Sequence, residues 1–434
     1  MSALPRNRVY RRLFAAQVVA LTGTGLATVA LSLLAYDLAG PRASAVLGTA
    51  LAIKMVAYVT VAPAVGALAG RIPPRALMAG ADAIRAGTAL ALPFVTELWQ
   101  VYALILLLQA ASAAFTPTFQ ATVPRVLPDE RDYTRALSLS RLAYDLESLL
   151  SPALAAALLT VVPYPWLFAG TTAGFLGSAA LVVTTALPRP GQAADAGSPG
   201  TPASAPPGPY ARAAGGARLF LAAPPLRALL ALHLAVAAAG ALVFADTVVL
   251  VRDHFQRPAE ALSLALGAYG AGSVAAALLL PRLLGRRGDR TVMLGAAAAL
   301  PALLAGAAAL AASAPGAGTW AAVLAAWAGL GAACSAVLTP AGRVIRRSAA
   351  EPELPAAFAA QFSLSHACWL LTYPLAGGLG ATAGLPAAAA VLAVLALAAV
   401  GVAARTWPRQ ERVAHAVRLA RPQPLGNGRS YGRS

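Results

Sequence analysis

Long apolar stretches, separated by short breaks rich in polar residues, Gly and Pro, recur along the whole chain. A helix needs roughly 20 mostly apolar residues to cross a bilayer, and twelve stretches of this kind can be marked out. Pro163–Pro165 and Gly380–Gly384 are the short breaks before the sixth and twelfth stretches. The pattern predicts twelve membrane-spanning helices, at 13–36, 44–69, 76–96, 98–120, 135–161, 165–187, 226–251, 260–281, 291–313, 318–338, 355–380 and 384–404.

The first stretch follows a cluster of arginines between Arg6 and Arg12, which is also how a secretory signal peptide begins. The apolar core of a signal peptide is only about 7–15 residues long. This stretch is longer, and a second one follows at once, so we interpret it as an uncleaved first helix.

A long polar interruption divides the spans into six and six. Its Pro-, Gly- and Ser-rich composition cannot bury a core and is typical of a flexible linker. We therefore expect an N-terminal six-helix bundle over 1–187, a flexible cytoplasmic linker over 188–222, a C-terminal six-helix bundle over 223–406, and a disordered basic tail over 407–434.

The composition supports a chain that lies mainly in lipid. Hydrophobic residues make up 59% and charged residues 11%, whereas a soluble domain carries about 25% charged residues. This excludes a soluble enzyme and a disordered chain. The net charge of +17 is the one figure that suggests a nucleic-acid binder.

The distribution of the basic residues resolves that conflict. If the N-terminus is cytoplasmic and every predicted span crosses, 27 of the 33 basic residues lie on the inner side and three on the outer side. The positive-inside rule predicts such a bias. We therefore expect a multi-pass protein of the plasma or inner membrane, with both termini cytoplasmic and no nucleic-acid partner.

Motifs for metal binding and catalysis are absent from the sequence. Cys334 and Cys368 lie inside apolar stretches, with no CxxC pair and no His at ligand spacing, so we interpret them as small buried residues and expect no metal. There is also no HExxH or GxSxG motif, which argues against a membrane enzyme such as a lipid-modifying transferase.

The two halves repeat each other. A shift of 215 residues aligns Gly70–Gly80 with Gly285–Gly295, with matching Gly, Arg and Met positions, and both segments join the second and third spans of a half. Shifts of 223 and 222 residues align Thr116-Pro117 with Thr339-Pro340 and Pro152 with Pro374. The common order indicates two homologous halves related by a pseudo-twofold axis.

These residues give the chain a resemblance to the major facilitator superfamily over about residues 10–405. The family's loop motif G-x-L-A-D-R-x-G-R-[RK] is matched within Gly66–Arg75 at Gly66, Leu68, Ala69, Arg71 and Arg75, while Gly70 stands where the family has Asp. The resemblance implies an all-α fold of two six-helix bundles and a drug- or metabolite-exporting branch.

In that family the loop belongs to a cytoplasmic gate that latches the two halves together. The resemblance therefore implies gating roles for Gly66, Arg71 and Arg75, and for the second-half counterparts Gly285, Arg286, Asp289 and Arg290. Because Gly70 replaces the family's Asp, the standard latch is altered, and Asp82 and Asp289 are candidates to replace it.

A second motif of the family, the antiporter sequence G-P-x-x-G-G, resembles Ser151–Ala156 around Pro152, and Pro374 with Gly377 and Gly378 lies closer to the pattern in the opposite half. Small residues permit the close helix approach that lipid itself does not favour. The alternative is a Pro kink with small packing residues and no transport role. The family's span-four Arg falls at Leu106, which weakens a proton mechanism carried over from the family.

Ionisable residues within spans are costly and therefore candidates for function. Lys54, Arg141, Asp145 and Glu147 are predicted to form a charged cluster beside a central cavity, in which a carboxylate exchanges a proton. The alternative is a permanently paired set that fixes helix register. Asp246 is a further candidate for substrate or proton binding, unless it reaches the outer interface.

The sequence thus predicts a secondary active transporter that works by alternating access, is not an enzyme, and acts as a monomer without a cofactor. Proton-coupled efflux of an amphiphilic small molecule is the favoured function. An importer or uniporter of a polar metabolite, and a transport-dead receptor or scaffold, are the alternatives.

Overall fold

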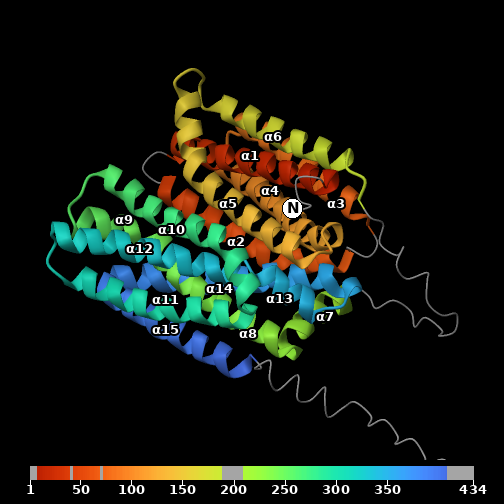
Figure 1. Cartoon of the computed structure of the whole chain (residues 1–434). Coiled ribbons are helices and arrows are strands. Elements are labelled where there is room, and N and C mark those ends of the chain that lie inside the picture. Colours follow the sequence, from red (N-terminus) through yellow and green to blue (C-terminus); the bar gives the residue numbers. More distant parts are fainter. Residues whose placement is uncertain (1–6, 40–42, 69–71, 188–208, 408–434) are drawn as a thin grey trace, which may run out of the picture.

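In the computed structural model, residues 7–39, 43–68, 72–187 and 209–407 are described, and within these ranges the chain is helical and has no strand. Figure 1 shows the long helices lying roughly side by side, with the first half of the chain (red to yellow) above the second half (green to blue). The arrangement is therefore one of two helical bundles that share a long interface.

Six helices form the first bundle, and every one of them coincides with a predicted span to within a few residues. They are α1 (Arg8–Ala39), α2 (Ala43–Leu68), α3 (Pro74–Ala91, extended by a 3₁₀ turn at Leu92–Phe94), α4 (Leu98–Val126), α5 (Glu130–Leu159) and α6 (Pro165–Val183).

Six further spans form the second bundle. The first consists of α8 (Pro224–Ala241), a π-helical segment η3 (Leu242–Asp246), α9 (Thr247–Val249) and a second π-helical segment η4 (Leu250–His254). The others are α10 (Ala259–Arg286), α11 (Asp289–Ala312), α12 (Ala317–Leu338) continued by α13 (Ala341–Ser348), then α14 (Leu354–Ala383, preceded by a 3₁₀ turn at Glu351–Glu353) and α15 (Leu385–Thr406).

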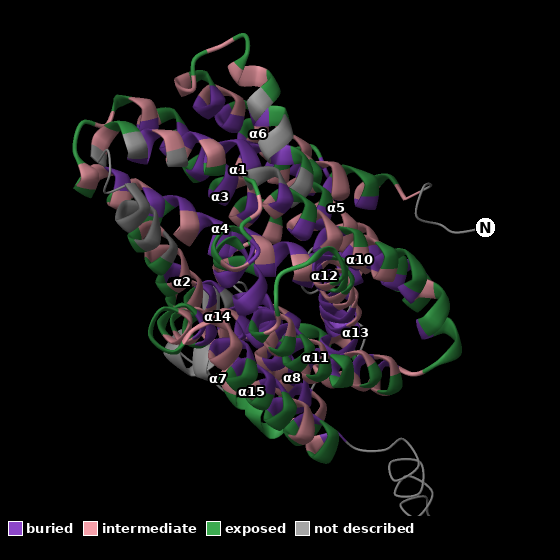
Figure 2. Ribbon diagram, turned by 90° about the vertical axis from the view of Figure 1, so that its left-hand side faces the viewer, coloured by how far each residue is buried: buried purple, intermediate pink, exposed green. Residues whose placement is uncertain are grey.

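The outer surface of the bundles is apolar. Large side chains such as Leu106, Leu278 and Val394 are about half exposed or more, and Figure 2 shows buried residues gathered between the helices and exposed ones on their outer faces. Within the described residues, eight helices meet the length and hydropathy expected of a membrane span. The helices α3, α5 and α14 are as long but more polar, and α2 contributes the shorter apolar segment Ala52–Val65.

Each bundle has its own core. The largest cluster of buried apolar side chains lies almost entirely in the second bundle, and the next two clusters lie in the first. The bundles meet mainly where α2 packs against α14 and where α5 packs against α10. Independent cores with a limited interface are what two bodies need if they are to move against each other.

Small residues allow the closest helix packing inside the second bundle. A Cβ atom added at Gly331 of α12 would lie 1.9 Å from the carbonyl oxygen of Tyr269 in α10, and one added at Gly272 would lie 1.9 Å from that of Ala328. Because lipid does not drive helices together, such backbone contact is a main source of their association.

The predicted linker is partly helical. Residues 188–208 lie outside the described residues, but 209–222 form the helix α7 (Pro209–Ala222), which packs against α2 and α14. The prediction of a flexible segment over all of 188–222 therefore does not hold for its last part, because Leu219 and Phe220 supply apolar side chains that pack on the second bundle. Residues 408–434 of the predicted tail also lie outside the described residues. We call the end of the molecule at which α7 lies the linker end.

Candidate functional site

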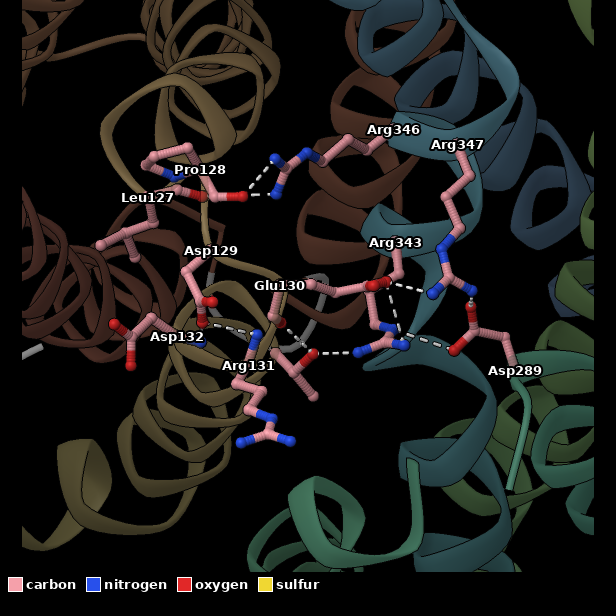
Figure 3. Close-up of polar contacts among 11 residues, drawn as sticks. Leu127, Pro128, Asp129, Glu130, Arg131, Asp132, Asp289, Arg343, Arg346 and Arg347 are labelled. Atoms are coloured by element: carbon pink, nitrogen blue, oxygen red, sulfur yellow. Dashed lines mark hydrogen bonds and ion pairs between the residues drawn. The ribbon is translucent and has the colours of Figure 1, made fainter. Parts of the chain in front are cut away.

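Three arginines of α13 tie the bundles together at the linker end (Figure 3). Arg343 Nε lies 2.9 Å from Asp289 Oδ1 at the start of α11, and Arg343 Nη2 lies 3.1 Å from Glu130 Oε1 at the start of α5. Arg343 also donates to the hydroxyl of Thr134. Arg347 pairs with the same two carboxylates, at 2.5 Å from Asp289. We call Glu130, Thr134, Asp289, Arg343 and Arg347 the latch.

The latch joins groups that are expensive to separate. The side chains of Arg343 and Asp289 are 8% and 6% exposed, whereas Glu130 and Arg347 are each 47% exposed. Removing one partner of a buried ion pair costs about 3–5 kcal/mol because the other charge is left unpaired. The buried pair therefore fixes α13 to its own bundle, and its half-exposed extension to Glu130 joins the two bundles.

Two neighbouring contacts strengthen this closure. Arg346 donates to the carbonyl oxygen of Pro128 over 2.6 Å and lies over the ring of Tyr133, 5.3 Å from its centroid. Arg125 of α4 lies 3.8 Å from the carboxylate of Glu351. Each contact runs from one bundle to the other, so the linker end is closed by side chains of both.

A cavity of about 200 Å³ lies between the bundles beside the latch. Its wall contains Gln17, Ser140 and Tyr144 from the first bundle and His233 and Gln361 from the second. Two of these contacts are hydrogen bonds: Ser140 donates to Gln17 Oε1 over 3.0 Å, and Gln361 Nε2 lies 3.1 Å from His233 Nε2. The cavity is therefore a polar pocket that both bundles build.

The predicted cluster of four ionisable residues divides into two groups. Arg141 and Asp145 form an ion pair of 2.8 Å, as their spacing on one helix predicts. Ser273 of α10 joins this pair from the other bundle: its hydroxyl donates to Asp145 Oδ2 over 2.6 Å and accepts from Arg141 Nη2 over 3.1 Å. The pair is thus part of the α5–α10 interface.

Glu147 and Lys54 form the second group. Glu147 faces α1, because a Cβ atom added at Gly25 would lie 2.9 Å from its Oε1. Its charge interacts with that of Lys54, whose ammonium lies 5.6 Å from the centroid of the Tyr58 ring. The Tyr58 ring in turn contacts His366 of α14, with centroids 4.6 Å apart. The structure therefore links Glu147 and Lys54 to the α2–α14 interface.

Asp246 does not line the cavity between the bundles. It is 5% exposed and lies inside the second bundle, in a small apolar pocket with Trp327 and Leu385. Its Oδ2 has no hydrogen-bond partner. The expectation that it faces a central cavity or the outer interface is therefore not met, because the π-helical segment that it ends changes the face on which it lies.

Asp82 lies away from the closure between the bundles. It is fully buried in α3 and pairs with Arg85 one turn later, and the Arg85 guanidinium lies between the rings of Phe115 and Phe175, 4.5 Å from each centroid. This places Asp82 inside the first bundle, as a structural pair rather than in the cytoplasmic gate.

Of the predicted gating residues, Asp289 alone belongs to the latch. Arg290 lies beside it, and its Nε donates to the carbonyl oxygen of Trp407 over 3.2 Å. Gly66 lies near the end of α2 and Arg71 outside the described residues, while the other predicted positions, Arg75, Gly285 and Arg286, are exposed.

The motif at Pro374 bends a helix without bringing another helix close. Pro374 lies inside α14, but a Cβ atom added at Gly377 or Gly378 would meet nothing within 4 Å. These two glycines therefore do not provide the close helix approach expected of them in this conformation. Pro152 lies within α5, at a position whose side chain is not among those described.

Sequence reasoning missed most of the latch. Glu130, Thr134, Arg343, Arg346 and Arg347 were expected only as part of the basic and acidic loops at the inner side. The one available signal is local: three arginines within five residues directly follow Thr339-Pro340, which breaks an apolar span. Their partners lie more than 200 residues away in sequence, and no pattern along the chain indicates that pairing.

Comparison with known proteins identifies the fold and the family. The structure is similar to the human organic anion transporter MFSD10 (TETRAN), with a TM-score of 0.68 and 14% identity over 92% of this chain and 99% of that one. It is also similar to a bacterial homologue of the iron transporter ferroportin in an outward-facing state (TM-score 0.72, 13% identity, 92% and 99% covered). A third similar structure is the transporter FucP in the outward conformation (TM-score 0.70, 14% identity, 92% and 98% covered).

None of the curated protein sequences matches the chain. The family model of the Major Facilitator Superfamily matches residues 13–255, which is more than half of the 434 residues. The chain therefore belongs to the major facilitator superfamily of membrane transport proteins.

Proposed function

We propose that this membrane transport protein is a secondary active exporter of an amphiphilic small molecule, driven by proton antiport. The observation that carries the proposal is a polar cavity built by both bundles and closed at one end by ion pairs between them. Rocking of two bundles around a shared site exposes that site to each side in turn.

The orientation of the protein follows from its charge. The linker end carries the arginine-rich segments, and 27 of the 33 basic residues fall on that side of the predicted topology. We propose that it faces the cytoplasm of the cell, in the plasma or inner membrane, and that the latch closes the cytoplasmic side.

Proton coupling is assigned to the carboxylates of α5. Asp145 bonds to α10 through Ser273, and Glu147 interacts with Lys54 of α2. Both contacts lie at or beside the interface between the bundles, so a change in protonation alters what holds the bundles together. Asp246 is a secondary candidate, because its Oδ2 is buried without a partner.

The altered loop after α2 is the main argument for a transport-dead receptor or scaffold. The latch around Asp289 supports transport instead, because it supplies a charged closure in the other half of the molecule. An importer or uniporter of a polar metabolite is compatible with the same cavity, and the direction of transport has to be measured.

The test has two stages. A growth screen of cells lacking and cells overproducing the protein identifies compounds whose toxicity the protein reduces. Uptake of those compounds into inverted membrane vesicles is then followed with and without an inside-acid pH gradient. Gradient-dependent accumulation supports proton-driven export; equilibration that ignores the gradient indicates a uniporter, and no movement of any compound that the screen yields contradicts the proposal.

A further inference from the structure

Three buried polar atoms without a hydrogen-bond partner face the cavity between the bundles. They are Oε1 of Gln120 in α4, the hydroxyl of Tyr133 in α5 and Oγ1 of Thr339 between α12 and α13. The residues Tyr133 and Thr339 are only 1% and 4% exposed. Buried polar atoms are almost always hydrogen-bonded, so three of them around one cavity require an explanation.

The cavity is too large for a single water molecule to be that explanation. One water needs roughly 10–15 Å³ of the same kind of volume, and this cavity offers about 200 Å³. It has room for a small organic molecule whose polar group satisfies the three atoms together.

The chemistry of the wall indicates an uncharged polar group. Of the described residues that line the cavity, Arg141 alone carries a full charge, and Asp145 neutralises it at 2.8 Å. A ligand ion would lie here without a counter-charge, which is costly in a low-dielectric site. An amide or hydroxyl group can instead donate to Gln120 Oε1 and accept from the hydroxyls of Tyr133 and Thr339.

The three atoms also lie directly beside the latch. Tyr133 is three residues from Glu130 in α5, and its ring lies under the guanidinium of Arg346. Its hydroxyl lies against α13, because a Cβ atom added at Gly342 would be 2.5 Å from it. Thr339 precedes α13 directly. A ligand bound to these groups touches both bundles at the point where they close.

We propose that Gln120, Tyr133 and Thr339 form a subsite for the amide or hydroxyl group of an uncharged small molecule, and that its occupation stabilises the closed linker end. This deepens the proposed function, on which it rests for the identification of that molecule as the transported substrate. Binding itself is measurable without transport.

The test uses the full chain in lipid nanodiscs and four probes with similar carbon skeletons. Phenylbutyramide and phenylbutanol are uncharged, phenylbutyrate is an anion and phenylbutylamine is a cation. Binding is measured by isothermal titration and by the shift in melting temperature. We expect the uncharged probes to bind more tightly than both ions and to raise the melting temperature.

Two variants and two matched controls locate the site. Loss of one neutral hydrogen bond predicts that Tyr133→Phe and Thr339→Val each weaken phenylbutyramide binding about five- to tenfold. Tyr10→Phe and Ser335→Ala remove hydroxyls that are also buried without a partner but lie outside this cavity, and they should leave binding unchanged. Because each control matches its variant in chemistry and burial, a general loss of folding appears in both.

The proposal is overturned if the ions bind as tightly as the uncharged probes, if no probe binds, or if Tyr133→Phe and Thr339→Val bind phenylbutyramide as the unaltered chain does. The last result would mean that ordered water alone satisfies the three atoms. Binding that depends on Tyr133 in a protein that fails the vesicle assay would refute the exporter while leaving the subsite in place. Transport of screened compounds that is unaffected in both variants, without any probe binding, would refute the subsite and leave the exporter in place.

Discussion

Ser273 of α10 and Asp145 of α5 share a hydrogen bond of 2.6 Å across the interface between the two bundles. The acceptor is a carboxylate that is also paired with Arg141, so a single side chain carries the charge balance of α5 and a contact with the other bundle. Protonation of Asp145 would weaken the ion pair and change the bond to Ser273 together. This geometry couples the charge of one residue to the separation of the bundles.

Replacing Asp145 by Asn is expected to abolish export driven by a pH gradient while exchange of substrate across the membrane persists. Asparagine keeps the shape of the side chain but cannot release a proton. Glu147→Gln is expected to give the same result if the second carboxylate carries the proton instead. Both are compared by uptake into inverted vesicles with and without the gradient, using a compound from the growth screen.

The control for this experiment is Asp253→Asn, which alters an exposed carboxylate at the end of η4. Its gradient-driven uptake should equal that of the unaltered chain. Undiminished gradient-driven transport in both Asp145→Asn and Glu147→Gln would show that neither residue carries the proton, and would favour the interpretation of permanently paired charges.

Replacing Arg343 by Gln is expected to open the linker end. The substitution leaves the buried carboxylate of Asp289 with only Arg347 and removes one of the two arginines that reach Glu130. Losing one partner of a buried pair costs a few kcal/mol, enough to raise the population of an open state about tenfold or more. The readout is the labelling rate of Ser140→Cys, inside the cavity, by an impermeant maleimide added to inverted vesicles.

The labelling experiment is done with Cys334 and Cys368 replaced by Ala, so that the new thiol is the only one. Arg286→Gln is the matched control, because Arg286 lies at the same end of the molecule but is exposed. Its labelling rate should stay at that of the Ser140→Cys parent. Equal rates in the Arg343 and Arg286 variants would mean that the latch does not hold this end closed.

The membrane spans could be predicted from the sequence because lipid imposes the same requirement on every helix. A stretch such as 226–251 has to be apolar throughout to cross the bilayer, and the structure places a helical span over Pro224–His254. The ion pair of Arg141 and Asp145 could also be predicted, since residues four apart on a helix face the same side.

Contacts between the bundles could not be predicted in the same way. Ser273 is an ordinary residue in an apolar span, and nothing in its neighbourhood marks it as the partner of Asp145. Asp246 shows a second reason: the π-helical segment Leu242–Asp246 takes one more residue per turn. A periodicity of 3.6 residues therefore misplaces the side chains that follow it.

Two glycine positions test the packing argument against the motif argument. Gly331→Ala would place a Cβ atom 1.9 Å from the backbone carbonyl oxygen of Tyr269, and α10 and α12 would have to separate. Overpacking of this kind costs about 1–3 kcal/mol or more, so the melting temperature should fall clearly. Gly377→Ala meets nothing within 4 Å and should leave the melting temperature unchanged or raise it, since Ala favours helix over Gly.

The same comparison carries information about motion. If Gly377→Ala leaves stability intact but slows transport of a screened compound, a helix must approach Gly377 in another conformation of the cycle. Equal destabilisation by Gly331→Ala and Gly377→Ala would contradict the packing described for α12 and α14.

Gly342 and Tyr133 are expected to be coupled in stability, because the space that glycine leaves open in α13 is filled by the Tyr133 hydroxyl. In Gly342→Ala the new methyl group would lie 2.5 Å from that hydroxyl oxygen, and the buried ring has little room to move. We expect the melting temperature to fall by an amount that corresponds to about 1–3 kcal/mol. In the double variant with Tyr133→Phe the nearest atom becomes a methyl carbon of Leu137 at 3.1 Å, so part of the loss should be recovered. A double-mutant cycle measures this recovery directly. Strictly additive effects would show that the Tyr133 hydroxyl does not lie against α13, and would remove the geometric link between the cavity and the latch.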